Sequence, residues 1–317
     1  MNGKLTRVLV VGAHSEESIR RFRALPNCTL TIAEDLRSVP PEELRETEIL
    51  VGFPDPELVR QMPRLRCVQL YSAGANNFSW LPKEIMLANA YGAYGESIAE
   101  HMLTTTLMVM KRMPEYLQMQ DRQDWSLLRD IGRFAGSRVL SVGMGAIGTA
   151  YLQRAAALGA ECYGVRRTLH DRPDFVRELV TAEGMDALLP EMDVVAISLP
   201  GTQDVTGMFD EGRLRRMKKT AILLNVGRGN CVVTEDLLRV MADGWLKAAC
   251  LDVMEPEPLP KGHPLWTAPR VYITPHISGG YRAGVNYDKV TDAVIRNLEL
   301  VLQGRPPVHI VDRELGY

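Results

Sequence analysis

Three segments in the second half of the sequence carry side chains suited to acid-base chemistry on a small anion. Arg228 follows the apolar run 221–226, Glu257 lies in a proline-rich segment, and His276 follows the apolar run 271–274. An arginine can bind a carboxylate through two parallel hydrogen bonds and polarise the adjacent carbonyl. A protonated histidine can give its proton to a developing alkoxide, and a carboxylate beside it orients the ring and favours its charged form. The three together predict reduction of a 2-keto acid.

Each of these residues also has a structural explanation when it is taken alone. Arg228 could be a loop cation, Glu257 a solvated acid, and His276 a turn residue held by hydrogen bonds. Their shared position, just after apolar runs, favours the catalytic interpretation, because open α/β sheets bind ligands at the carboxyl ends of their strands.

A glycine-rich turn predicts a dinucleotide site. The segment 143–148, which reads Gly-Met-Gly-Ala-Ile-Gly, follows the apolar run 138–142 and precedes a helical pattern that ends at Leu158. In this setting the first glycine permits a tight turn, the second admits a pyrophosphate, and the third lets the helix pack on the strand. The alternative is a chance cluster of glycines at a turn. The predicted contacts are Gly143, Gly145, Ala146, Ile147 and Gly148.

The position that discriminates between cofactors follows the next apolar run. An Asp or Glu usually stands there to bind the ribose 2′-hydroxyl, about 20 residues after the motif. This sequence has Arg166, Arg167 and Thr168 instead. Because guanidinium groups can bind a 2′-phosphate that an acid would repel, we expect NADP(H) to be preferred, with NAD(H) possible. The alternative is that both arginines are solvated loop residues.

Short apolar runs typical of strands alternate along the sequence with helical patterns, and this alternation predicts a parallel α/β fold. Helical patterns cover 15–25, 56–62, 96–113, 149–158, 235–242 and 287–302. The predicted strands are 7–11, 29–33, 49–53, 67–71, 138–142, 162–165, 194–199, 221–226, 248–253 and 271–274.

The 317 residues are enough for two domains. We expect a substrate domain formed by 1–95 and 285–317, and a dinucleotide-binding domain formed by 96–284, with the active site in the cleft between them. The helix 287–302 would then cross back onto the first domain. The opening turn of that first domain, 12–16, lacks the glycine spacing and is not expected to hold the cofactor.

Composition excludes several classes of protein. The formal net charge is −2 and no basic tail is present, so we expect no nucleic-acid partner. No stretch is apolar and long enough to predict a membrane segment or a signal peptide, and we expect a cytoplasmic protein. The five cysteines are scattered and contain no CxxC pair, so neither disulfides nor a metal site is predicted.

Taken together, the sequence resembles the D-isomer-specific 2-hydroxyacid dehydrogenase family, in its glyoxylate/hydroxypyruvate reductase-like branch. The resemblance implies a flavodoxin-like substrate domain with an inserted Rossmann domain, and a homodimer. It rests on 71–74, 97–101, the glycine turn, 198–202, 225–229, 251–253 with 257–258, and 275–276.

The resemblance also implies site residues. Arg228, Glu257 and His276 match the catalytic triad, at separations of 29 and 19 positions, with Glu257 rather than Glu255 as the acid. The backbone around Ala73 and Gly74 would hold the substrate carboxylate, and the substrate-binding residues would be Ser72, Ala73, Gly74, Arg228 and His276. Asp252 would lie by the nicotinamide amide. Further cofactor contacts are expected at Ser198, Leu199, Pro200, Thr206, Val226, Gly227 and Gly279.

The sequence departs from the common family pattern at Ala75-Asn76-Asn77, which stands in place of Val-Asp, and at Arg166. Trp266 resembles the keto acid reductase branch, although it can also be a core residue. Two alternatives remain open. One is a non-catalytic, corepressor-like protein that binds NAD(H), because a fold alone does not establish activity. The other is a formate- or phosphite-type dehydrogenase.

Overall fold

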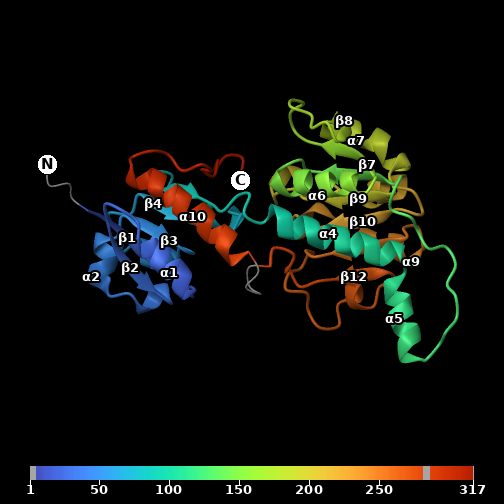
Figure 1. Cartoon of the computed structure of the whole chain (residues 1–317), viewed down its shortest axis with the longest axis horizontal. Helices are drawn as coiled ribbons and strands as arrows, with labels where there is room; N and C mark the ends of the chain where they lie inside the picture. The colour runs from blue at the N-terminus through green and yellow to red at the C-terminus, as the bar shows by residue number, and fades with distance from the viewer. Residues whose placement is uncertain (1–4, 281–285, 317) are drawn as a thin grey trace. The chain divides into compact units, whose positions relative to one another are not determined.

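The computed structural model describes residues 5–280 and 286–316. The chain divides into two compact units, which are described separately. Unit 1 comprises Met1–Tyr94 and Asn286–Tyr317, and unit 2 comprises Gly95–Val285. Figure 1 shows the elements of both.

Unit 1 is built on a sheet of five parallel strands in the order β2-β1-β3-β4-β5. This is the flavodoxin-like order, in which the topological switch point lies between β1 and β3. The strands are β1 (Thr6–Val11), β2 (Cys28–Ala33), β3 (Ile49–Val51), β4 (Cys67–Gln69) and β5 (Met86–Ala88). The central residues of β1, β3, β4 and β5 are buried, as expected for parallel strands that helices cover on both faces, whereas the edge strand β2 is half-buried along its length.

The helices of unit 1 are α1 (Glu16–Arg23), α2 (Pro41–Glu46), α3 (Pro56–Val59) and α10 (Tyr287–Leu302). Ser15 caps α1 by accepting a hydrogen bond from the amide of Ser18. The last helix, α10, packs against α1 and β4, although the whole of unit 2 separates them in sequence. Ser18 and Thr291 join α1 to α10 through a buried hydroxyl contact of 3.2 Å.

Unit 2 contains a sheet of seven parallel strands in the order β12-β11-β10-β9-β6-β7-β8. The chain starts at β6, runs outward to β8, and then returns to build the other half from β9, so the switch point lies between β6 and β9. This is the Rossmann arrangement with one added strand. The strands are β6 (Arg138–Val142), β7 (Glu161–Val165), β8 (Val176–Val180), β9 (Val194–Ile197), β10 (Ile222–Asn225), β11 (Ala248–Leu251) and β12 (Val271–Ile273).

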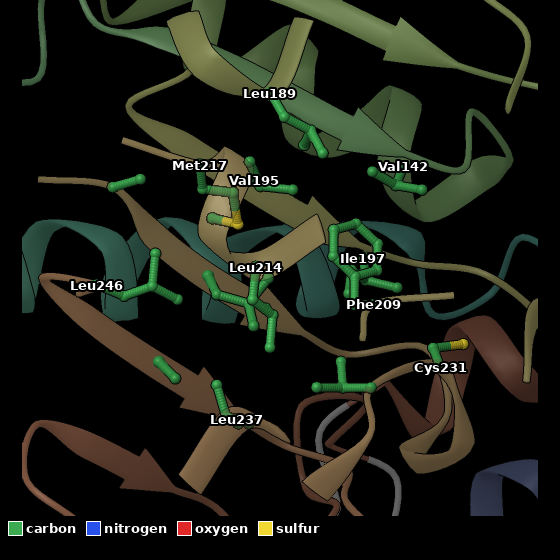
Figure 2. Packing of buried hydrophobic residues seen from close by; sticks show 14 of the residues in the cluster. Val142, Leu189, Val195, Ile197, Phe209, Leu214, Met217, Cys231, Leu237 and Leu246 are labelled. Atoms are coloured by element: carbon green, nitrogen blue, oxygen red, sulfur yellow. The ribbon is translucent and has the colours of Figure 1, made fainter. Parts of the chain in front are cut away.

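The helices of unit 2 are α4 (Gly95–Met110), α5 (Met113–Asp121), α6 (Ala146–Ala157), α7 (Ala182–Leu188), α8 (Glu211–Arg216) and α9 (Thr234–Ala242). Helices α4 and α6 pack on each other and on the sheet. A core cluster joins the strands to α8 and α9. Figure 2 shows part of this cluster, which includes Leu214 of α8, Leu237 of α9 and the strand residues Val195 and Ile197.

The fold class predicted from the sequence is confirmed, but several elements differ from the expectation. Six of the ten predicted strands end one or two residues earlier than expected, because the chain leaves the ladder to form loops. The short strand β5 and the edge strand β8 were not predicted. The helix expected over 96–113 ends at Met110. Arg112 adopts a left-handed backbone with φ 54°, and the separate helix α5 begins at Met113 with Pro114 in its first turn. Within the described ranges, no helix combines the length and apolarity needed to cross a bilayer.

Candidate functional site

The glycine turn of unit 2 has a geometry that only glycine permits. Gly143 has φ 105°, in the left-handed region. A Cβ on Gly148 would lie 1.9 Å from the carbonyl oxygen of Gly143 and 2.5 Å from Oγ of Ser141. The close approach of α6 to β6 therefore requires a glycine at position 148.

The turn also presents the start of α6 as a site for phosphate. Gly145 caps the helix without a side-chain hydrogen bond, and the first turn carries no acidic residue. The hydroxyls of Ser141 and Ser198 both donate to the carbonyl of Gly143, at 2.9 and 3.1 Å, and fix the turn. Half-buried Ala146 and Ile147 follow it. These residues fit the pyrophosphate of a dinucleotide, which the positive end of a helix attracts.

Two arginines follow the carboxyl end of β7. Arg166 is half-buried, and its Nη1 donates to the carbonyl of His170 at 3.1 Å, while Arg167 and Thr168 are exposed. No acidic residue follows β7 before Asp171. This edge of the cofactor unit is therefore cationic, as a 2′-phosphate requires.

Arg228 follows β10 and is held from several sides. Asn225, which is fully buried, accepts from the amide of Gly227 at 3.1 Å and donates to the carbonyl of Arg228 at 3.0 Å. The guanidinium Nη1 donates to the carbonyl of Gly227 at 2.7 Å. A Cβ on Gly201 would lie 2.7 Å from Cγ of Arg228, so the side chain packs directly on the glycine backbone.

The electrostatic environment of Arg228 is unusual for an arginine. Burial lowers the pKa of its guanidinium, and the charge of Glu257 opposes that shift. A half-buried guanidinium is poised to bind an anion, because the negative charge of the anion offsets the cost of removing the guanidinium from water.

His276 and Glu257 are in direct contact. Nδ1 of His276 lies 2.6 Å from Oε1 of Glu257, and the two side chains are 50% and 34% exposed. His276 has φ 53°, a left-handed conformation that is uncommon for a residue with a side chain. Backbone strain of this kind concentrates at functional sites.

Asp252 fixes the loop that bears His276. Its Oδ1 accepts from Thr274 Oγ1 at 2.6 Å and from the amide of Ile277 at 2.9 Å, while Oδ2 accepts from the amide of Ser278 at 3.0 Å. Burial alone would raise the pKa of Asp252, but the hydrogen bonds from Ser278, Thr274 and Ile277 outweigh it and lower that pKa. The carboxylate thus stays charged and anchors the loop.

The remaining predicted contacts of unit 2 lie at the same edge of its sheet. Ser198, Leu199 and Pro200 follow β9, Val226 and Gly227 follow β10, and Gly279 follows the His276 loop. Thr206 accepts a hydrogen bond from Asn230 at 2.9 Å. Because parallel strands share a carboxyl edge, this arrangement collects the predicted cofactor and catalytic residues of unit 2 on one side.

In unit 1, the Ser72–Gly74 loop follows β4. The carbonyls of all four residues from Tyr71 to Gly74 accept hydrogen bonds, from Tyr94 Oη at 2.5 Å, the amide of Ala90 at 3.0 Å, Asn89 Nδ2 at 2.7 Å and Ser72 Oγ at 2.7 Å. Within the described part of the chain, the amides of Ala73 and Gly74 donate to nothing. Such amides can bind a carboxylate.

Sequence reasoning missed two residues that shape these loops, Asn89 and Asn225. Both are buried amides at the carboxyl end of an apolar strand run, and both bond the backbone of a predicted site residue. A polar residue that ends an apolar run is the signal that could have found them.

A cavity of about 360 Å³ in unit 2 lies outside the predicted site. It is lined by α4 residues, including His101 and Thr105, by β11 and β12, and by Trp266. Burial lowers the pKa of His101, and the charge of Asp252 opposes that shift. Trp266 is 51% exposed and its Nε1 donates to the carbonyl of Pro260, so it is not a core residue.

Comparison with known proteins gives consistent matches. Residues 103–278 match the family model of the D-isomer specific 2-hydroxyacid dehydrogenase NAD binding domain. The chain is 31% identical over 274 residues to a glyoxylate reductase of Thermofilum pendens, which covers 82% of this chain and 79% of the relative.

Two solved structures are similar over nearly the whole chain. A D-isomer specific 2-hydroxyacid dehydrogenase family protein of Aeromonas salmonicida is 27% identical with a TM-score of 0.88, covering 97% of this chain and 99% of that one. An NADPH-dependent glyoxylate/hydroxypyruvate reductase of Sinorhizobium meliloti, in complex with NADP and sulfate, is 25% identical with a TM-score of 0.83, covering 98% and 100%.

Proposed function

Because the chain belongs to the D-isomer-specific 2-hydroxyacid dehydrogenase family, we propose that it reduces a 2-keto acid of the glyoxylate or hydroxypyruvate type to the D-2-hydroxy acid. The chain is an oxidoreductase with an NAD(P)-binding Rossmann domain. The observation that supports the reaction best is the His276–Glu257 hydrogen bond, at the sheet edge that also bears Arg228 and the glycine turn.

The proposed proton donor is Nε2 of His276. Glu257 accepts the hydrogen of Nδ1, which leaves Nε2 as the ring atom that can give a proton to the substrate oxygen. The carboxylate also holds the orientation of the ring. When bound, the nicotinamide supplies the hydride that reaches C2 of the keto acid.

The proposed role of Arg228 is to bind the substrate carboxylate and polarise the carbonyl. Its Nη1 bonds the carbonyl of Gly227, whereas Nε and Nη2 donate to no group in the described ranges and are available to an anion. The amides of Ala73 and Gly74 are proposed as further carboxylate donors. In the same proposal Asp252, whose oxygens anchor the His276 loop, also faces the nicotinamide amide.

We propose NADP(H) as the preferred cofactor, with NAD(H) as a possible substitute. Arg166 and Arg167 after β7 support this preference, and the Sinorhizobium meliloti relative was solved with NADP. Because these arginines are positively charged, the segment after β7 is suited to bind a 2′-phosphate.

We also propose a homodimer that uses the segment from α5 to residue 131. This segment exposes Met113, Leu117, Trp125, Leu127 and Ile131, at 44%, 56%, 102%, 83% and 46%. Single exposed apolar side chains are ordinary, but five within 19 residues form the kind of surface that a second copy covers.

The function is tested by purified enzyme with NADPH or NADH and a panel of glyoxylate, hydroxypyruvate, pyruvate and phenylpyruvate. His276→Ala should reduce kcat by at least about 100-fold, the usual contribution of a general acid, while the Kd for NADPH stays within threefold. His309→Ala, a half-buried histidine of unit 1, is the control and should keep activity.

Two results would contradict the proposal. Activity of His276→Ala within a few-fold of the wild type rejects His276 as the proton donor. Failure of every keto acid with both cofactors rejects the proposed reaction itself.

A further inference from the structure

Helix α4 contacts the loop that bears His276 at both of its ends. Ser97 Oγ donates to the carbonyl of Ser278 at 3.0 Å, and Nε2 of His101 lies 3.4 Å from Oγ1 of Thr274. Thr274 is two residues before His276, and Ser278 is two residues after it. Ser97 and His101 are four residues apart on α4, so they lie on the same side of the helix. One side of α4 therefore holds the chain before and after His276.

The direction of the His101 contact follows from the groups around Thr274. Thr274 Oγ1 gives its only hydrogen to Oδ1 of Asp252 at 2.6 Å, so it can only accept from His101. Burial lowers the pKa of His101, although the charge of Asp252 opposes that shift, and a neutral ring with its hydrogen on Nε2 supplies the donor. Asp252 in turn accepts from the amides of Ile277 and Ser278, at 2.9 and 3.0 Å. A continuous chain of hydrogen bonds thus joins His101 to the residues after His276.

The backbone of His276 depends on such support. Its φ of 53° is left-handed, a conformation that persists in a residue with a side chain only where the surrounding structure fixes it. Pro275, His276 and Ile277 are exposed, whereas Thr274 is half-buried and Ser278 is 5% exposed. The exposed part of the loop is therefore anchored through the two residues that α4 contacts.

A catalytic acid tolerates little displacement. An error of about 1 Å in the placement of a reacting group can cost about 100-fold in rate. Glu257 contacts the ring of His276, through Nδ1 at 2.6 Å, and the backbone that carries the ring depends on other contacts. Ser97 and His101 supply two of them from a helix that is rigid and largely buried.

We propose that Ser97 and His101 form an α4 clamp, a pair of positioning residues that holds the backbone of His276 so that Nε2 can deliver its proton to the substrate. The clamp acts through the residues that flank His276. This inference rests on the proposed function and assigns two further residues to it. Because the clamp acts on proton delivery, its loss should lower kcat rather than raise KM.

The test compares the wild type with Ser97→Ala, His101→Ala and the double variant on glyoxylate, hydroxypyruvate, pyruvate and phenylpyruvate, with NADPH and with NADH. For every acid that the wild type reduces, the double variant should lower kcat by at least about tenfold, because misplacement of a reacting group can cost up to about 100-fold. The KM for the keto acid and the Kd for NADPH should change little. Ser97→Ala should account for most of the loss, because its hydrogen bond is the shorter of the two.

A solvent isotope effect distinguishes a positioning role from a merely structural one. The ratio of kcat in water to kcat in deuterium oxide should rise in the double variant, because transfer of the proton from a displaced His276 becomes a larger part of the rate limit. General loss of stability lowers the amount of folded enzyme and leaves this ratio unchanged.

Two variants control for damage to the helix. Thr105→Ala removes a hydroxyl one turn further along the same side of α4, where it bonds the carbonyls of His101 and Met102 within the helix, at 3.0 and 3.1 Å. It should leave kcat nearly unchanged. Ser97→Thr keeps the Oγ donor and should retain most of the activity that Ser97→Ala loses. Thermal unfolding of each variant measures the accompanying change in stability.

The outcomes separate this inference from the function on which it rests. A double variant whose kcat and isotope effect equal those of the wild type overturns the clamp, and so does an equal loss in Thr105→Ala, because the loss would then reflect damage to α4 in general. A double variant that weakens NADPH binding without lowering kcat also overturns it, because α4 would then act on the cofactor. In these cases the dehydrogenase activity stands. Absence of wild-type activity with all four acids and both cofactors overturns the proposed function, and the clamp with it.

Discussion

Removing the amide of Asn89 should damage substrate binding more than the loss of stability alone explains. Asn89 is 5% exposed, its Nδ2 donates to the carbonyl of Ala73 at 2.7 Å, and its Oδ1 accepts from the amide of Tyr91 at 3.2 Å. Asn89→Ala therefore leaves the half-buried carbonyl of Ala73 without its donor, which costs about 1 kcal/mol, the lower end of the range for an unsatisfied group. The same change frees the peptide that orients the amide of Gly74.

The expected consequence is a rise in KM for the keto acid of about tenfold, equivalent to about 1.4 kcal/mol of lost binding, with little change in the Kd for NADPH. Steady-state kinetics, fluorescence titration with NADPH and urea unfolding measure the three quantities. The matched control is Thr47→Ala. Thr47 is 3% exposed and its Oγ1 donates to the carbonyl of Glu43 at 2.8 Å, but it precedes β3 at the amino edge of the sheet, whereas the Ser72–Gly74 loop follows β4 at the carboxyl edge.

Both variants should lose similar stability, and only Asn89→Ala should raise KM. An equal rise in both would mean that KM follows general destabilisation of unit 1. An unchanged KM in Asn89→Ala would show that the orientation of the Ser72–Gly74 loop does not matter for binding, which refutes the reasoning.

The cofactor and the assembly give two further predictions. Arg166→Glu should lower the ratio of kcat/KM for NADPH to that for NADH by at least tenfold, because a carboxylate repels the 2′-phosphate that the guanidinium binds. A wild-type enzyme whose kcat/KM is tenfold higher with NADH than with NADPH would reject the proposed preference for NADP(H). Trp125→Glu should shift a wild-type dimer toward monomer in light scattering at micromolar concentration, without lowering the Tm of the monomer, because the indole is fully exposed. A monomeric wild type would reject the proposed interface.

The buried strands and the glycine turn could be predicted from the sequence, because each has a distinctive local pattern of residues. Buried parallel strands read as apolar runs, and the strand-turn-helix around Gly143 has few alternatives, because its glycines meet backbone atoms at distances that exclude a side chain. In contrast, β8 shows a mixed burial pattern at the edge of its sheet, and β5 is only three residues long. Neither stands out from a loop in the sequence.

Some contacts of the candidate site could likewise be predicted from the sequence and others could not. The types and spacing of Glu257 and His276 led to the expectation that they meet, and the structure places them in contact. The sequence could not show that Asn89 fixes Ala73, or that the side chain of Arg228 packs on Gly201, because each contact joins residues that are distant along the chain. The break after Met110 was readable from Pro114, because in a continuous helix the proline ring would clash with the carbonyl four residues earlier, which is that of Met110.

The packing of α10 on α1 and β4 has a consequence for biosynthesis. A ribosome delivers the first 94 residues, then the whole Rossmann unit, and only afterwards the helix that seals the earlier sheet. Until then Gln69 and Asn89 lack their partner Asn297, and the apolar surface under α10 is open to solvent or to a chaperone. We therefore expect unit 1 to complete its folding last, although its first 94 residues are made first.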